Sequence, residues 1–278
     1  MPQKSDFYFE KTNILTNFTF AQQECNFPCF VYKKKGKIGM RLTYIYHSGF
    51  AIEADGFAIL IDYYKDTGKS PEKGFVHEEL LNRAGTLYIL ASHFHPDHFN
   101  PEVLRWKNYK KDIVYIFSKD ILKRGRAGKE DAIYLKKGDT YEDHNLRIEA
   151  FGSTDSGISF LIDAGGKRLF HAGDLNNWHW KDESTPEEVA EAEKNYLKEL
   201  DDLVKVADMD VAMFPVDPRI GTDFMRGAQQ FVDRIKTNIF VPMHFWERPA
   251  EVVAFGPYAE SHGCRYVLIS VPGEGTDI

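Results

Sequence analysis

Four side chains that can bind a metal ion lie within six consecutive positions of this sequence, directly after the apolar residues 86–91. They are His93, His95, Asp97 and His98. Side chains alternate along an extended segment, so the first three can point the same way, and the bend at Pro96 lets the last histidine join them. Imidazole and carboxylate together suit zinc, manganese or iron. The run therefore predicts a metal site at the end of a buried strand.

Three further metal-binding or acidic residues each follow an apolar run that is typical of a strand. Asp62 ends the run 58–61, Asp174 follows 169–173, and His244 follows 239–243. A polar residue just beyond an apolar strand lies at the rim of a sheet, where loops gather and ligands bind. We therefore expect these three residues to complete the site that the first cluster begins, because a catalytic metal needs three or more protein ligands.

The elements that must position these residues are many short strands and a few helices, which favours two packed sheets with helices outside. We expect strands at 41–46, 50–54, 57–63, 86–91, 113–117, 132–135, 146–151, 157–163, 168–172, 209–214, 238–242 and 265–270. Helices are expected near 76–84, 101–108, 184–206, 222–236 and 248–262. His77 and His262 fall on two of these helices and are expected at the surface, whereas His171 is expected to be buried and hydrogen-bonded.

Composition is that of an ordinary globular protein. The net charge of -7 disfavours a nucleic-acid partner, which usually needs a basic face. No apolar stretch is long enough to span a membrane, and three cysteines without a signal peptide favour a cytoplasmic protein. Residues 1–39 lack periodicity and are expected to be a poorly ordered extension of a domain at 40–278. A homo-oligomer is compatible with the sequence.

The ordered set of Asp62, the His-Phe-His-Pro-Asp-His run, Gly173-Asp174 and Pro242-Met-His244 resembles the metallo-β-lactamase superfamily. His47-Ser-Gly-Phe50 is most similar to its lactonase-like branch, the ascorbate-6-phosphate lactonase type. The resemblance implies an α+β fold, a four-layer αββα sandwich of two mixed sheets, with two metal ions at one edge. It implies that His93 and His95 bind the first ion, that Asp97, His98 and His244 bind the second, and that Asp174 bridges both. It further implies that Asp62 orients a ligating histidine.

The sequence departs from the superfamily pattern at one ligand of the first metal. Ser153 stands where the family usually has histidine, in a Gly-His-Thr loop. Either Asp155 or His179 supplies the missing ligand, or the first site is weak and one metal suffices. We expect zinc first, with manganese or iron as alternatives for an oxygen-richer site. His47 and Ser153 are expected beside the metals rather than on them.

These residues predict a metal-dependent hydrolase with Asp97 and His98 at the centre of the reaction. Hydroxide held by the metal would cleave an ester, lactone or phosphodiester bond in a small anionic metabolite. Two alternatives stay open: a non-catalytic, metal-stabilised binding or sensor domain, and a phosphodiesterase that acts on nucleic acid.

Overall fold

The computed structural model describes residues 39–278 except 71 and 207. The extension expected at residues 1–39 lies, but for its last residue, outside this range, so the start of the domain at residue 40 stays a prediction.

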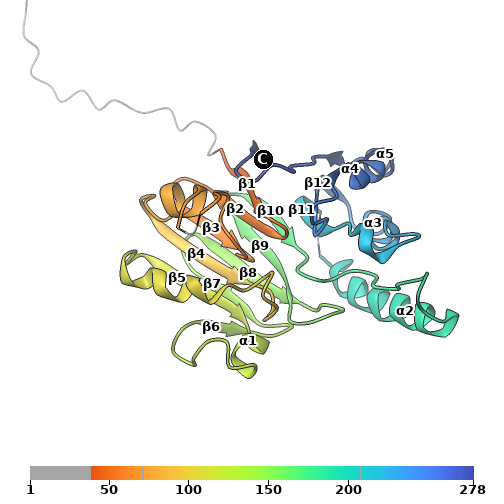
Figure 1. The fold of residues 1–278 in the computed structure, drawn as a ribbon, viewed down its shortest axis with the longest axis horizontal. Coiled ribbons are helices and arrows are strands. Elements are labelled where there is room, and N and C mark those ends of the chain that lie inside the picture. Colours follow the sequence, from red (N-terminus) through yellow and green to blue (C-terminus); the bar gives the residue numbers. More distant parts are fainter. Residues whose placement is uncertain (1–38, 71, 207) are drawn as a thin grey trace, which may run out of the picture. The chain divides into compact units, whose positions relative to one another are not determined.

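The first sheet contains seven strands in the order β14-β1-β2-β3-β4-β5-β6 (Figure 1). Its strands are β1 (Arg41–Tyr46), β2 (Gly49–Glu53), β3 (Phe57–Ile61), β4 (Thr86–Ala91), β5 (Ile113–Ser118), β6 (Ile133–Leu135) and β14 (Gly275–Asp277). Strands β3 to β6 run parallel, while β14, β1, β2 and β3 pair antiparallel. The parallel strands β3 to β6 therefore all end at the same edge of this sheet.

The second sheet also contains seven strands, in the order β13-β12-β11-β10-β9-β8-β7. They are β7 (Thr140–Glu142), β8 (Leu146–Phe151), β9 (Ser159–Ala164), β10 (Lys167–His171), β11 (Met209–Pro215), β12 (Thr237–Met243) and β13 (Arg265–Tyr266). Strands β10 to β13 run parallel and β7 to β10 antiparallel. Both sheets are therefore mixed.

The main core combines side chains of both sheets, such as Leu42 and Phe50 from the first and Phe160 and Val211 from the second. Because alternate strand residues point to opposite faces, a second cluster forms on the outer face of the first sheet. Leu60 and Ile89 there meet residues from helical turns η1 (Val76–Leu80) and η2 (Pro101–Asn108) and from α1 (Lys119–Lys123).

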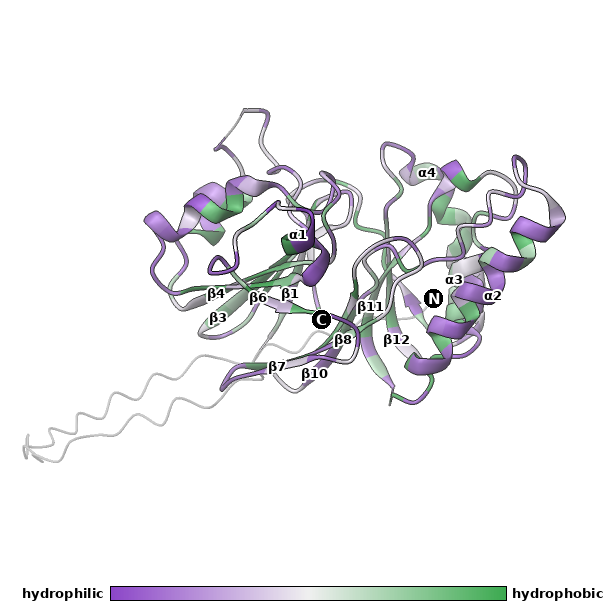
Figure 2. Cartoon of the chain, turned by 90° about the horizontal axis from the view of Figure 1, so that it is seen from below, coloured by the Kyte–Doolittle hydropathy of each residue, from purple (hydrophilic) through white to green (hydrophobic). Residues whose placement is uncertain are grey.

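Helices α2 (Pro186–Leu203) and α3 (Arg226–Val232) cover the second sheet (Figures 1 and 2). Thr185 and Glu188 form the capping box at the start of α2, and Tyr196, Leu200 and Leu203 form its buried face. The shorter segments are η3 (Pro218–Ile220), α4 (Pro249–Val252), η4 (Val253–Phe255) and α5 (Gly256–Ser261). The predicted fold class, an α+β sandwich of two mixed sheets with flanking helices, is confirmed.

Several predicted elements differ in extent. The helix expected at 248–262 is divided among α4, η4 and α5, the strand expected at 265–270 keeps only two residues, and β7, β14 and α1 were not expected. His77 is not a surface residue, because its side chain is only 8% exposed and contacts Asp66 at 2.7 Å and Glu102 at 3.1 Å. The prediction for His171 is confirmed: it is fully buried, and its Nε2 lies 2.8 Å from the Ser48 carbonyl oxygen.

Candidate metal centre

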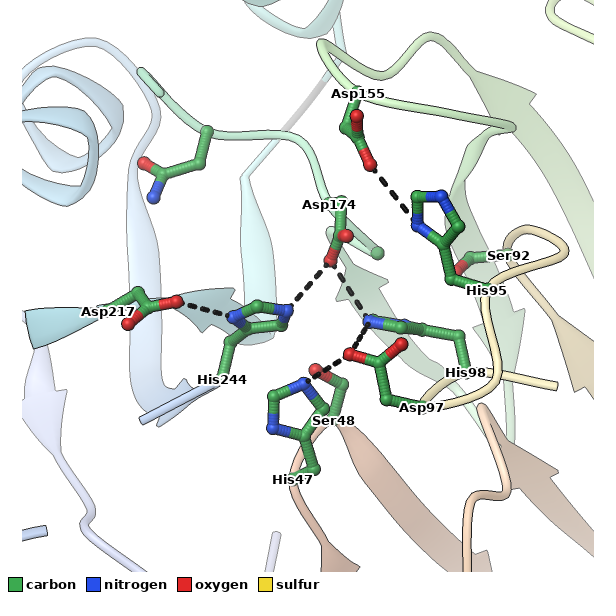
Figure 3. A network of polar contacts seen from close by, with 12 residues as sticks. His47, Ser48, Ser92, His95, Asp97, His98, Asp155, Asp174, Asp217 and His244 are labelled. Atoms are coloured by element: carbon green, nitrogen blue, oxygen red, sulfur yellow. Dashed lines mark hydrogen bonds and ion pairs between the residues drawn. The ribbon is translucent and has the colours of Figure 1, made fainter. Parts of the chain in front are cut away.

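The candidate centre lies where parallel strands of both sheets end. The segment 92–98 follows β4, Asp174 follows β10 by three residues, and His244 follows β12 directly. Polar residues gather at such carboxyl edges because the loops that leave them converge there. Figure 3 shows these side chains pointing toward one another from segments far apart in the sequence.

One group of four side chains offers ligand atoms that all lie within 4.8 Å of one another. It consists of His47, Asp97, His98 and His244. Asp97 Oδ2 lies 3.2 Å from His47 Nε2 and 3.8 Å from His98 Nε2. The three histidines are buried, so the group offers three imidazoles and one carboxylate in a site nearly closed to water.

A second group meets the same 4.8 Å criterion and consists of His93, His95, Asp155 and Asp174. His95 Nδ1 lies 3.3 Å from Asp155 Oδ2, and these two side chains are 36% and 45% exposed. This group offers two imidazoles and two carboxylates and opens toward solvent on the side of Asp155.

Asp174 joins the two groups. Its Oδ2 lies 3.3 Å from His93 Nε2, while its Oδ1 lies 3.1 Å from His98 Nε2 and 3.3 Å from His244 Nε2. The two oxygens of one carboxylate therefore face different groups, an arrangement that can bridge two metal ions.

Two buried carboxylates hold histidines of the centre from behind. Asp62 Oδ2 lies 2.7 Å from His98 Nδ1 and accepts a 2.6 Å hydrogen bond from the Ser92 hydroxyl. Asp217 Oδ2 lies 2.8 Å from His244 Nδ1. Each contact leaves the Nε2 atom of its histidine directed at the centre, which fixes the orientation that a metal needs.

Asp217 was not among the residues expected from the sequence. It follows the apolar strand β11, just as Asp62 follows β3 and His244 follows β12. The strand-end signal that selected those residues would have selected Asp217 as well.

Three residues of the centre have a left-handed backbone that is uncommon for residues with side chains: His47 (φ 59°), Asp62 (φ 50°) and His244 (φ 62°). The backbone N–H of His244 donates to the carbonyl of His47 at 3.3 Å, which ties the end of β12 to the turn after β1. Such conformations persist only where the surrounding structure holds them, and they often mark functional sites.

Burial, with the neighbouring His244, lowers the pKa of His47 to about 3, so its imidazole is neutral and can bind a metal. Burial alone would raise the pKa of Asp174, but the charges of His98 and His244 hold it well below its usual range. The pKa of Asp97 is likewise lowered, against the effect of burial, by His47 and His98. The carboxylates are therefore ionised.

Several polar atoms of the centre are buried without a hydrogen bond to any described residue. They are His98 Nε2, His244 Nε2, Asp174 Oδ1 and both ring nitrogens of His47. Unsatisfied buried polar atoms are costly, and a metal ion bound to His98, His244, Asp174 and one ring nitrogen of His47 would satisfy four of these five atoms. The residues present therefore fit a bound divalent cation.

Two residues expected near the first metal do not join either group. His179 is buried, but its Nε2 lies 3.3 Å from the Asp223 carbonyl oxygen, and its Nδ1 accepts from the Lys181 N–H at 3.1 Å. The structure therefore does not support His179 as the replacement ligand. Ser153 Oγ accepts a long hydrogen bond of 3.4 Å from the backbone N–H of Asp155. Asp155 belongs to the second group, whereas Ser153 belongs to neither.

A pocket of about 280 Å³ opens on the centre. It is lined by His95, Asp97, Thr154, Asp155, Asp174, Trp178, Trp180, Arg219 and His244. Both groups thus contribute to its wall, and its size suits a small molecule.

The fold and the paired groups define a metallo-β-lactamase-type centre, and sequence comparison agrees. The family described as "Beta-lactamase superfamily domain" matches residues 41–190, and the chain belongs to this superfamily. Among curated proteins, a UPF0173 metal-dependent hydrolase of Symbiobacterium thermophilum is 26% identical, covering 84% of this chain and 98% of that protein. A UPF0173 metal-dependent hydrolase of Carboxydothermus hydrogenoformans is 21% identical, with the same coverage. The predicted enzyme class agrees with these relatives.

Solved structures share the fold. Igni18, described as a novel metallo hydrolase from the archaeon Ignicoccus hospitalis, aligns with a TM-score of 0.62 at 20% identity, covering 86% of this chain and 98% of that one. CmlA, a diiron β-hydroxylase from Streptomyces venezuelae, aligns with a TM-score of 0.59 at 15% identity, covering 88% and 54%. Within the described residues, no helix is long and apolar enough to cross a membrane.

Proposed function

We propose that this protein is a hydrolase that uses two divalent metal ions to cleave an ester, lactone or phosphodiester bond in a small anionic metabolite. The observation that carries the proposal is the pair of four-residue groups that share Asp174 and open on one pocket. Bound there, metal ions would lower the pKa of a water molecule and polarise the bond to be cleaved.

The two groups support unequal metal sites. The group of His47, Asp97, His98 and His244 is nitrogen-rich and buried, which suits zinc. The group of His93, His95, Asp155 and Asp174 has more oxygen and is partly exposed, so manganese or iron fits there as well. We infer that the buried site binds more tightly, and that His47 adds a ligand that the resemblance did not supply.

The chain supplies a carboxylate that can orient water in the wall of the pocket. Asp97 lines the pocket, is 24% exposed and is held ionised by its neighbours, so it can accept a hydrogen bond from a water molecule and orient it. His98 is fully buried and does not line the pocket, so its part in the reaction is to hold a metal and not to touch the substrate.

The lactonase-like assignment rests on His47-Ser-Gly-Phe50 and on the compact length of the chain, and it belongs to this proposal with a lactone as the first substrate class to test. A cytoplasmic location and a homo-oligomer stay predictions.

The test combines elemental analysis with a panel of lactones, nitrophenyl esters and bis(nitrophenyl) phosphate. We expect up to two divalent ions per chain, turnover of at least one compound class, and a loss of roughly 100-fold or more in kcat for Asp97→Asn with metal still bound. Full metal occupancy with no turnover of any compound would instead indicate the binding or sensor domain.

A further inference from the structure

We propose that Arg219, Trp178 and Trp180 form a recognition subsite that binds a carboxylate or phosphate group carried on a flat, apolar body. The inference rests on the proposed function, because it assigns the part of the same pocket that selects the substrate. It concerns binding and not the bond-breaking step.

Arg219 is held rigidly before any ligand arrives. Its Nε lies 2.9 Å from Asp217 Oδ2 and 3.1 Å from Oδ1, and its Nη2 lies 2.6 Å from Oδ2. Its guanidinium carbon also lies 4.9 Å from the centre of the Trp246 ring. One edge and one face of the guanidinium are thus fixed, and binding with the remaining edge costs little side-chain entropy.

The remaining edge of this guanidinium is available to a ligand. Arginine has five N–H donors, and Asp217 takes only those of Nε and Nη2. The Nη1 group forms no hydrogen bond with the described part of the chain, and the side chain is 42% exposed. Parallel N–H groups of this kind match the two oxygens of a carboxylate or phosphate.

Arg219 is the one arginine or lysine among the described residues that line the pocket. Arg219 and His244 line the same pocket, so an anion bound by Arg219 would lie in the pocket that opens on the buried metal group. The three carboxylates of the two groups carry one charge fewer than two divalent ions would bring.

Another part of the wall is aromatic. Trp178 and Trp180 lie with ring centres 6.2 Å apart and planes 17° from parallel. The intervening His179 is buried, and its ring nitrogens contact the Asp223 carbonyl and the Lys181 N–H and do not line the pocket. The Trp178 Nε1–H donates to the carbonyl of Asp174 at 2.8 Å, so this wall is fixed to the centre. Flat apolar groups pack well on such surfaces.

Arg219 could instead have a purely structural role. Arg219 could serve only to hold Asp217, which in turn orients His244. In that case its loss would affect every substrate equally and would not alter the affinity for an anion. The two explanations therefore differ in a measurable way.

The experiment compares Arg219→Gln, Arg219→Lys and Trp180→Ala with Arg248→Gln as the matched control. Arg248 is an exposed cation on the loop after β12 that pairs with Glu251 and does not line the pocket. The metal-loaded protein is tested with nitrophenyl hemisuccinate, which carries a carboxylate, and with the neutral nitrophenyl butyrate. Benzoate affinity is measured by calorimetry, and metal content and thermal unfolding are measured for each variant.

We expect Arg219→Gln to raise KM for the hemisuccinate and weaken benzoate binding by about 10-fold or more, the effect of losing a charged hydrogen bond. KM for the butyrate should stay within about two-fold, because that ester lacks the charge. Arg219→Lys should give KM and benzoate affinities between those of the original protein and Arg219→Gln. Trp180→Ala should weaken benzoate binding. Arg248→Gln should change neither KM nor benzoate affinity.

Equal effects of Arg219→Gln on both esters, with benzoate affinity unchanged, would overturn the subsite. Failure of the proposed function looks different: no ester would be hydrolysed, whereas benzoate binding would still depend on Arg219. If ester turnover does not depend on Arg219, the proposed hydrolase activity would stand, but the proposed subsite would be wrong.

Discussion

Asp155 lies at the exposed side of the centre, where its carboxylate faces His95 at 3.3 Å. The superfamily pattern that this chain resembles usually has a histidine ligand two residues earlier, at the position of Ser153. Because a carboxylate is a weaker zinc ligand than imidazole and this one is half exposed, the first metal should bind less tightly than the second.

We predict that Asp155→Ala lowers the metal content from about two ions per chain toward about one, because the exposed group would keep only two histidines of its own and a carboxylate, Asp174, that it shares with the buried group. The remaining ion should belong to the buried group that contains His98. Elemental analysis after dialysis measures this, with Ser153→Ala as the control from the same loop. Unchanged stoichiometry in Asp155→Ala would contradict the role of this carboxylate, and a gain of metal in Ser153→His would support a weak first site.

Asp217 acts on the centre through His244. Removing its negative charge leaves His244 without its acceptor, so Asp217→Asn should weaken metal binding to the buried group by roughly 10- to 100-fold. Competition titration with a chromogenic chelator measures this affinity. Asp210→Asn is the control, because Asp210 lies in β11, the strand that precedes Asp217, and accepts a hydrogen bond from the Arg168 N–H away from the centre. Equal affinities in the two variants would rule out the orienting role.

At the scale of elements, the sequence was sufficient to predict most strands but not every residue of the metal centre. Apolar runs located β1 to β5 and β8 to β12 to within a few residues, and the strand-end signal found Asp62, Asp174 and His244. It could not show that His47 belongs to the buried group, because that depends on how the turn after β1 packs against the end of β12. Nor could spacing choose between Asp155 and His179, because only the folded loops place Asp155 beside His95 and His179 beside the Asp223 carbonyl.

The loop that carries Asp155 is fixed to the segment of His93 by a glycine. Gly157 has φ +70°, and a Cβ there would lie 2.0 Å from the Ser92 carbonyl oxygen and 2.6 Å from the His93 Cβ. Gly166, in the turn between β9 and β10, has a similar φ of +76° but has no atom within 4 Å of such a Cβ. Comparing alanine substitutions at the two glycines therefore distinguishes the cost of a positive φ from the cost of the steric contact.

We predict that Gly157→Ala destabilises the fold by roughly 1–3 kcal/mol more than Gly166→Ala, since overpacking a close contact costs about that much. It should also lower metal content at the exposed group, because the backbone of the ligand segment must move. Denaturant unfolding and elemental analysis measure the two effects. Equal stabilities would mean that the close approach relaxes at no cost.

At the scale of the whole molecule, the two groups connect the two sheets. His47 and residues 93–98 come from loops of the first sheet, whereas Asp155, Asp174, Asp217 and His244 come from loops of the second. The core between the sheets is apolar and continuous, so folding does not depend on the metals alone. Ions held by ligands from both sheets would nevertheless add a cross-link at an edge where several buried polar atoms lack partners among the described residues.

Metal removal should therefore lower the stability of the entire domain and not only that of the loops. A ligand that binds the native state alone stabilises it by about 2.7 kcal/mol when present at roughly 100 times its Kd. We expect chelation to lower Tm in a single cooperative transition, with a smaller decrease for Asp155→Ala, which has one ion fewer to lose. Calorimetry with and without chelator measures both. A Tm that chelation leaves unchanged in a protein shown to lose its metal would mean that the sheets are held together without the centre, and the ions would then serve the reaction only.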